Sequence, residues 1–166
     1  MWQLANARDD RRVEPEHERK SMGSEETLGQ DVTGRAEVKR LLLSHCERVA
    51  RHLRGKGMRA RGVRVKGRYQ QGLELVSRDH RLNSLFDDSE TLYREACRLL
   101  DRLDLDRPMR LIGVAAFDLT EETGGQGDLF DDGPTPRSRV EHAMDSLRER
   151  LGDKVRRASL KPRDPP

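Results

Sequence analysis

The stretch V-R-V-K-G-R-Y, which begins at Val63, constrains the fold more than any other part of the chain. Apolar and basic side chains alternate along it, and a period of two is typical of a β-strand with one face buried. Val63 and Val65 would then point into a core, while the opposite face would carry Arg64, Lys66 and Arg68. The stretch therefore predicts a sheet that is covered on one side and basic on the other.

The apolar pattern elsewhere supplies the elements around this strand. We expect a strand around 20–32, a helix over 38–53 that G-K-G at 55–57 ends, a return strand at 73–79, a helix after Asp87 and Asp88, and a buried strand at 109–117. The order β-α-β-β-α-β predicts an α+β fold, in which a four-stranded antiparallel sheet carries both helices on one face. A C-terminal helix is expected at 137–152 from apolar residues at helical spacing, namely Val140, Ala143, Met144, Leu147 and Leu151.

Composition limits the size of the core and the type of protein. Only 33% of the residues are hydrophobic and 4% are aromatic, which predicts one compact core over part of the chain. No apolar run approaches the ~20 residues of a membrane span, and no signal peptide opens the chain. Cys46 and Cys97 each fall in a helical pattern, which is typical of reduced core residues in a cytoplasmic protein.

Charge is distributed unevenly along the chain. Nine Lys or Arg residues lie between Arg54 and Arg81, against only Glu74 and Asp79. Six acidic residues and no basic ones lie between 118 and 132. The basic segment indicates a polyanionic partner, and the acidic one indicates a different contact.

Acidic pairs at 9–10, 87–88 and 131–132 raise the possibility of a two-metal site. None of them lies on an expected strand, and Asp87 or Asp88 stands where a helix needs an N-cap. Capping and solvated loops are therefore the favoured interpretation. No nucleophile motif, phosphate-binding loop or dinucleotide fingerprint is present, so the sequence predicts no catalytic residue and no metal ligand in this chain.

Basic residues on an open sheet face suit contacts with nucleic-acid phosphates, which carry no sequence information. RNA-recognition modules share the β-α-β-β-α-β order but need stacking aromatic residues on their central strands. Tyr69, at a strand end, is the main candidate here. Backbone binding is therefore favoured over base stacking, and an unrelated RNA-binding module is the weaker alternative.

Several motifs resemble those of Y-family DNA polymerases. K-S-M-G-S-E-E-T-L at 20–28 is similar to the signature that opens their little finger domain, and V-R-V-K-G-R-Y and R-L-I-G-V at 110–114 resemble its later strands. Residues 4–15 resemble the end of the thumb, and residues 140–152 resemble the C-terminal segment of many DNA polymerase IV sequences. The motifs occur in the order found in that family.

The resemblance implies four regions: the end of the thumb and a linker at 1–19, the little finger at 20–120, an acidic clamp-binding loop at 121–136, and a C-terminal helix and tail at 137–166. It implies DNA contacts in sequence-independent binding to a primer–template duplex. The candidates are Lys20, Ser21, Arg61, Arg64, Lys66, Arg68, Arg78 and Arg110.

The resemblance also accounts for an apolar pair within the acidic segment. Gln126, Leu129 and Phe130 match the Q-x-x-L-F motif by which such polymerases bind the sliding clamp, and Asp128 lies within it. The two apolar side chains would act as anchors in a pocket of the clamp.

The chain is expected to be a C-terminal piece of a translesion polymerase, because the palm and fingers of that family have no counterpart in it. The Mg²⁺ that serves catalysis would belong to the parent polymerase, and this chain alone would need no cofactor. The alternative is a non-catalytic Y-family accessory protein that brings a mutagenesis complex to the clamp.

Overall fold

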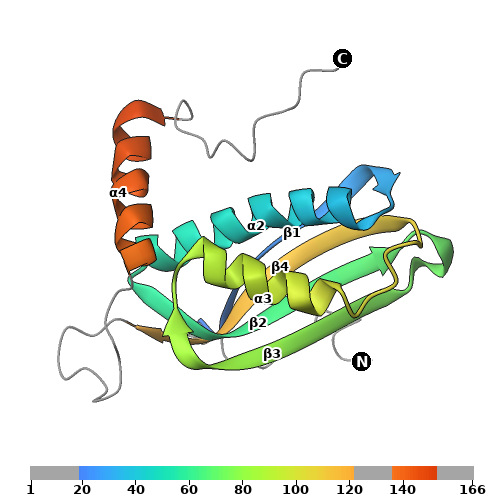
Figure 1. Ribbon diagram of the computed structural model, residues 1–166, viewed down its shortest axis with the longest axis horizontal. Helices are drawn as coiled ribbons and strands as arrows, with labels where there is room; N and C mark the ends of the chain where they lie inside the picture. Colours follow the sequence, from blue (N-terminus) through green and yellow to red (C-terminus); the bar gives the residue numbers. More distant parts are fainter. Residues whose placement is uncertain (1–18, 122–135, 153–166) are drawn as a thin grey trace, which may run out of the picture.

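The computed structural model describes residues 19–121 and 136–152, and within them the predicted order of elements is confirmed (Figure 1). The strands are β1 (Ser21–Val32), β2 (Met58–Tyr69), β3 (Leu75–Phe86) and β4 (Met109–Glu121), and the helices are α2 (Arg35–Gly55), α3 (Ser89–Leu100) and α4 (Pro136–Leu151). A short 3-10 helix, η1 (Gln71–Leu73), joins β2 to β3. The strands are longer than the sequence pattern indicated, since β2 begins at Met58 and β3 continues to Phe86.

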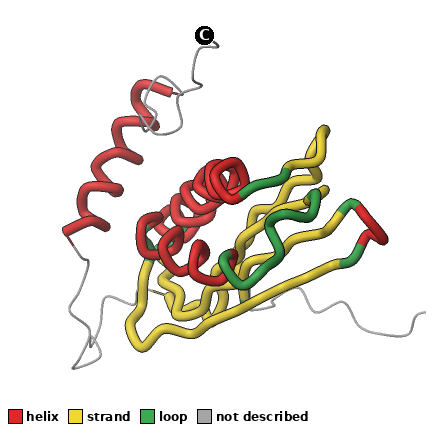
Figure 2. The backbone as a smooth tube through the Cα atoms, turned by 45° about the vertical axis from the view of Figure 1, so that its right-hand side comes forward, coloured by secondary structure: helices red, strands yellow, loops and turns green. Residues whose placement is uncertain are grey.

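The four strands form one antiparallel sheet in the order β1-β4-β2-β3. Helices α2 and α3 lie side by side on the same face of this sheet, as Figures 1 and 2 show. The predicted α+β architecture is therefore confirmed. Strands β4 and β2 are central, so their side chains define the middle of both faces.

The core fills the space between the sheet and the two helices. Val63 and Val65 of β2 are fully buried, as their alternation with basic residues predicted. They pack with the inward-facing residues of α2, α3 and β4, which include Leu42, Val49, Leu53, Leu92, Leu99, Ile112 and Val114. Both cysteines are free, with Cys46 buried on α2 and Cys97 half-buried on α3.

The helix ends follow the expected local chemistry. Gly57, which follows α2, has a φ of 59°, the left-handed conformation that commonly ends a helix. Asp88 is the N-cap of α3, where its carboxylate accepts a hydrogen bond of 2.7 Å from the Thr91 amide. The helix ends at Leu100, and the buried Leu103 lies in the turn that follows it.

A buried histidine lies where α2 packs on β1. His45 is fully buried, and its Nδ1 lies 2.9 Å from the Ser24 hydroxyl. Its Nε2 lies 3.8 Å from a carboxylate oxygen of Glu26. Burial lowers the pKa of His45 below its usual value, and the nearby Arg48 guanidinium lowers it further, whereas Glu26 opposes the shift.

Helix α4 stands at the end of α2 (Figure 1), and its surface is not arranged as the sequence pattern suggested. The apolar side chains of Val140, Leu147 and Leu151 are exposed. The buried side chains are polar instead, namely those of Ser138 and Glu141. None of the helices in the described part of the chain is long and apolar enough to span a membrane.

Candidate nucleic-acid interface

The face of the sheet opposite α2 and α3, here called the open face, is defined by the strand register. Residues directly opposite each other in an antiparallel pair point to the same side. Because Val63 and Val65 face the helices, their neighbours Arg64 and Lys66 face away from them. The register then gives four rows across β1, β4, β2 and β3: Ser21–Phe117–Gly62–Arg81, Gly23–Ala115–Arg64–Asp79, Glu25–Gly113–Lys66–Ser77 and Thr27–Leu111–Arg68–Leu75.

No described helix covers the open face (Figure 2), which combines small residues with long basic ones. Its four basic residues are Arg64, Lys66, Arg68 and Arg81, against the two acidic residues Glu25 and Asp79. Most of its remaining positions are Gly, Ala, Ser or Thr. The long basic side chains therefore stand among short ones, which suits contact between their charges and a row of nucleic-acid phosphates.

Lys66 has an acidic partner on the same face. Its Nζ lies 2.9 Å from a carboxylate oxygen of Glu25 on β1, and both side chains are substantially exposed. The intervening β4 residue is Gly113, where an added methyl group would overlap Glu25. The glycine leaves the space through which the two side chains meet.

One end of the open face carries an aromatic ring between two arginines. Phe117 lies over Gly62, where an added methyl group would overlap its ring. The guanidinium carbons of Arg64 and Arg81 lie 5.1 Å and 5.8 Å from the ring centroid, within the range of cation–π attraction. Arg81 also lies 3.7 Å from the Asp118 carboxylate.

The structure brings some of the predicted DNA-contacting residues together and separates others. Ser21, Arg64, Lys66 and Arg68 lie on the open face, and Lys20 lines a surface depression with Arg64. The other three of the eight candidates lie apart from this group.

Arg78 lies opposite Val65, so its Cα–Cβ bond points to the helix-facing side at the sheet edge. Arg61 lies at the register shift between Ala60 and Gly62 in the β2–β3 pairing, with its Nε buried and without a hydrogen-bond partner among the described residues. Arg110 lies beyond the last regular row and is 3.5 Å from the Asp31 carboxylate. Whether any of the eight residues contacts DNA remains a prediction.

Sequence reasoning missed Arg81, Glu25 and Phe117 on this face. Tyr69, which it considered as a stacking residue, is buried instead, and its hydroxyl accepts a hydrogen bond from the Asp104 amide. Arg81 follows Ser77 and Asp79 at strand spacing, so counting the register from the β2–β3 turn would have found it. Phe117 was missed because 109–117 was interpreted as a buried strand, and its apolar run does not distinguish one face from the other.

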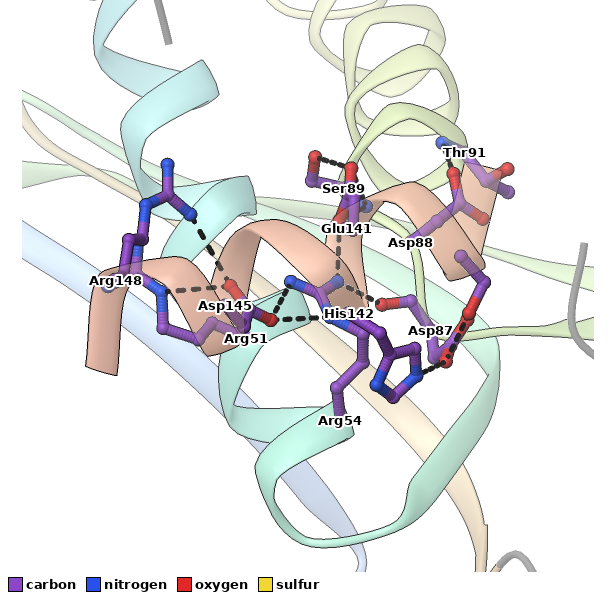
Figure 3. Close-up of polar contacts among 11 residues, drawn as sticks. Arg51, Arg54, Asp87, Asp88, Ser89, Thr91, Glu141, His142, Asp145 and Arg148 are labelled. Atoms are coloured by element: carbon purple, nitrogen blue, oxygen red, sulfur yellow. Dashed lines mark hydrogen bonds and ion pairs between the residues drawn. The ribbon is translucent and has the colours of Figure 1, made fainter. Parts of the chain in front are cut away.

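A second group of polar residues holds α4 against the sheet-and-helix body (Figure 3). The side chain of Arg54, near the end of α2, is only 3% exposed. Its Nε donates to Asp145 at 2.7 Å, and one of its terminal nitrogens donates both to Glu141 and, at 2.9 Å, to the Asp87 carbonyl. A buried guanidinium with this many acceptors is a specific anchor for α4.

The start of α3 completes this junction. The Glu141 carboxylate accepts hydrogen bonds from the Ser89 amide, at 3.0 Å and 3.2 Å, and from the Ser89 hydroxyl. Asp87 accepts a hydrogen bond of 2.9 Å from Ser138 and lies 3.4 Å from His142. The acidic pair at 87–88 therefore makes structural contacts at the starts of α3 and α4. These contacts agree with the helix-capping interpretation of the pair.

The predicted clamp-binding residues, Gln126, Asp128, Leu129 and Phe130, lie outside the described residues. The residues that flank this segment are described, with β4 ending at Glu121 and α4 beginning at Pro136. The contacts of Arg54 with Glu141 and Asp145 therefore fix the position of α4, the first described element after this segment.

Comparison with known proteins agrees with this architecture. The model of the impB/mucB/samB family C-terminal domain matches residues 19–129. DNA polymerase IV of Desulfatibacillum aliphaticivorans is 34% identical over 157 residues, which cover 92% of this chain and 39% of that protein. DNA polymerase IV of Brucella melitensis is 28% identical over 153 residues, which cover 92% of this chain and 34% of that protein.

This chain therefore spans between a third and two fifths of the length of these relatives. Among solved structures, an insertion ternary complex of Dbh DNA polymerase matches 72% of this chain and 34% of that chain, with a TM-score of 0.52 and 19% identity. A post-insertion binary complex of the same polymerase gives a TM-score of 0.52 at 18% identity. These structural matches support the fold.

Proposed function

The chain belongs to the impB/mucB/samB family through its C-terminal domain, and we propose on this basis that it binds the backbone of primer–template DNA without sequence preference. In this proposal it is the little finger of a DNA polymerase IV-like protein that acts in translesion synthesis. It holds the duplex, while nucleotidyl transfer belongs to the catalytic domains of the polymerase.

The observation that carries this proposal is the run of Arg64, Lys66 and Arg68 on the open face of the sheet. Three basic residues at alternate positions of one strand span about 13 Å, at the usual rise of about 3.3 Å per residue. That spacing allows contact with more than one phosphate of a nucleic-acid strand. Neutralising phosphates releases counterions, so the proposal predicts affinity that falls steeply with salt.

The test is a titration of a primer–template duplex with the chain at several salt concentrations. The double substitution Arg64→Ala/Arg68→Ala should lower the slope of log affinity against log salt by about 2 and weaken binding to all sequences equally. The matched control is Arg94→Ala/Arg98→Ala, which removes the same charge from α3, where both residues pair with Glu95. Salt-independent binding, or equal effects of the two double substitutions, would contradict the proposal.

We further propose that residues 126–130 attach the chain to the sliding clamp. The support is the Q-G-D-L-F sequence, with Leu129 and Phe130 in a segment otherwise rich in acidic residues and glycine. Its position also supports the proposal, because it lies between β4 and α4, and α4 is held by the buried Arg54. A short extended segment needs no fold of its own to present two anchors to an apolar pocket.

Clamp binding is tested with the purified clamp, the chain and a peptide of residues 122–134. Burial of each large apolar side chain contributes roughly 1.5–3 kcal/mol, while a micromolar interaction totals about 8 kcal/mol. The substitution Leu129→Ala/Phe130→Ala should therefore abolish binding and leave the melting temperature nearly unchanged. The control is Leu147→Ala/Leu151→Ala, which removes two exposed leucines from α4. A loss of several degrees in melting temperature on Leu129→Ala/Phe130→Ala would instead make that pair part of the core.

A further inference from the structure

The geometry points to a two-arginine phosphate clamp at one end of the open face, in which Phe117 holds Arg64 and Arg81 for a single DNA phosphate group. This inference rests on the proposed DNA binding and deepens it, because it assigns a specific anion site and a positioning residue. Arg81 and Phe117 come from strands β3 and β4, which are separated by β2 in the sheet.

The first step is the placement of the ring. Phe117 shares a row with Gly62 and Arg81, so its side chain leaves β4 on the open face. Gly62 has no side chain, and the ring occupies the space above it. The ring is thereby packed against the β2 backbone at Gly62, which restricts the positions that it can take.

The second step is what the ring holds. Arg64 lies 5.1 Å and Arg81 lies 5.8 Å from the ring centroid, measured from the guanidinium carbon. Cation–π attraction contributes about 0.5–1 kcal/mol at an exposed site, which restrains two long side chains that would otherwise sample many rotamers. The ring therefore lowers the entropy that the arginines lose when they bind an anion.

The third step is the surrounding charge. The same two arginines line a surface depression of about 670 Å³ with Arg19 and Lys20. Its acidic residues are Asp118 and Glu121, so positive charge is in excess. Asp118 lies 3.7 Å from Arg81, which is an ion-pair distance longer than a hydrogen bond.

The chemistry of the ligand follows from the donors. Guanidinium groups offer planar pairs of N–H donors that match phosphate oxygens, and two of them can contact one phosphate group. A stacked nucleobase is the other ligand that an exposed ring could bind. The arginines over the ring and the packing on Gly62 favour the phosphate, because the ring already contacts two guanidinium groups and the β2 backbone.

The test uses the full chain and a primer–template duplex in a salt titration. Arg81→Ala should lower the slope of log affinity against log salt by about 1. The matched control is Arg98→Ala, which removes the same charge from α3, on the covered side of the sheet, where Arg98 pairs with Glu95. It should change the slope less than Arg81→Ala does.

The role of Phe117 is separated from base stacking by a double-mutant cycle. Phe117→Leu should weaken binding several-fold in the wild-type background and have no further effect when Arg64 and Arg81 are both alanine, since the ring acts through the arginines. Phe117→Trp should restore binding, because tryptophan also attracts cations. Melting temperatures of all variants report on folding separately.

The outcomes are distinguishable. If the wild-type chain does not bind DNA, both the proposed DNA binding and the two-arginine phosphate clamp are wrong. If it binds with the expected salt dependence but Arg81→Ala and Arg98→Ala have equal effects, the two-arginine phosphate clamp alone is wrong. A Phe117→Leu effect that persists without the two arginines would overturn the phosphate clamp in favour of base stacking.

Discussion

Lys66 and Glu25 form an ion pair of 2.9 Å across the open face, although their strands, β2 and β1, are separated by β4. The pair lies within the surface proposed to bind DNA phosphates. A phosphate that approaches Lys66 must therefore compete with a carboxylate that is already in place. Glu25 would also repel the phosphate, so we expect this carboxylate to lower the affinity of the open face for DNA.

Glu25→Gln should therefore strengthen DNA binding. Exposed ion pairs contribute about 0.2–1 kcal/mol, so we expect a rise in affinity of roughly 1.5- to fivefold at low salt and a smaller rise at high salt. Glu26→Gln is the matched control, because it makes the same change in charge at the next residue, on the helix-facing side near His45. Equal effects of the two substitutions would mean that only net charge matters.

Gly113→Ala should destabilise the fold. The added methyl group would meet the Cα and Cβ of Glu25 and lie 3.1 Å from the Ser24 carbonyl oxygen. Because two of these atoms belong to the backbone, strands β1 and β4 must shift, which typically costs about 1–3 kcal/mol. Chemical denaturation measures the free energy of unfolding. The control is Gly29→Ala on β1, where no atom lies within 4 Å of the added group.

The sequence predicted those features that depend on local periodicity. The alternation of Val63 and Val65 with basic residues indicated both faces of β2, and the acidic pair at 87–88 indicated the start of a helix. Phe117 was missed because its strand, M-R-L-I-G-V-A-A-F, is almost wholly apolar, so no alternation of polar and apolar residues marks the open face. Its contact with Arg81 also depends on strand order, which residue spacing does not determine.

The packing of α4 was also beyond sequence reasoning, for a different physical reason. An apolar stripe along Val140, Leu147 and Leu151 usually marks the buried side of a helix. Here Glu141 and Asp145 make the buried contacts instead. Their partner is Arg54, near the end of α2 and far away in the sequence, whose side chain is almost completely buried. Only the tertiary structure brings these charges together.

Arg54→Ala should release α4 from the body of the protein. The substitution leaves the buried Glu141 carboxylate without its guanidinium, and removal of one partner of a buried pair typically costs about 3–5 kcal/mol. We expect amide hydrogen exchange in 136–151 to become fast while β2 and β4 stay protected. DNA binding should persist, since the open face is not altered.

The control for this prediction is Arg51→Ala. Arg51 also pairs with Asp145, but at 3.6 Å and with a side chain that is 45% exposed. Such a pair contributes at most about 1 kcal/mol, so exchange in α4 should hardly change. If Arg54→Ala and Arg51→Ala give the same exchange rates, the buried guanidinium does not anchor the helix.

The last prediction concerns pH. Burial holds the pKa of His45 below its usual value of about 6.5, so the unfolded chain takes up a proton at a higher pH than the folded protein does. Above pH 6.5 the histidine is neutral in both states and does not affect stability. As pH falls below 6.5 the unfolded state gains the proton first, so the free energy of unfolding should fall until the pH drops below the folded pKa.

Denaturation at pH 7.5, 6.5, 5.5 and 5.0 would measure this fall in the free energy of unfolding. His45→Gln should remove the part of the slope that is due to this residue, and His52→Gln, at an exposed position of α2, is the control substitution. Identical slopes in all three proteins would show that His45 does not couple protonation to folding.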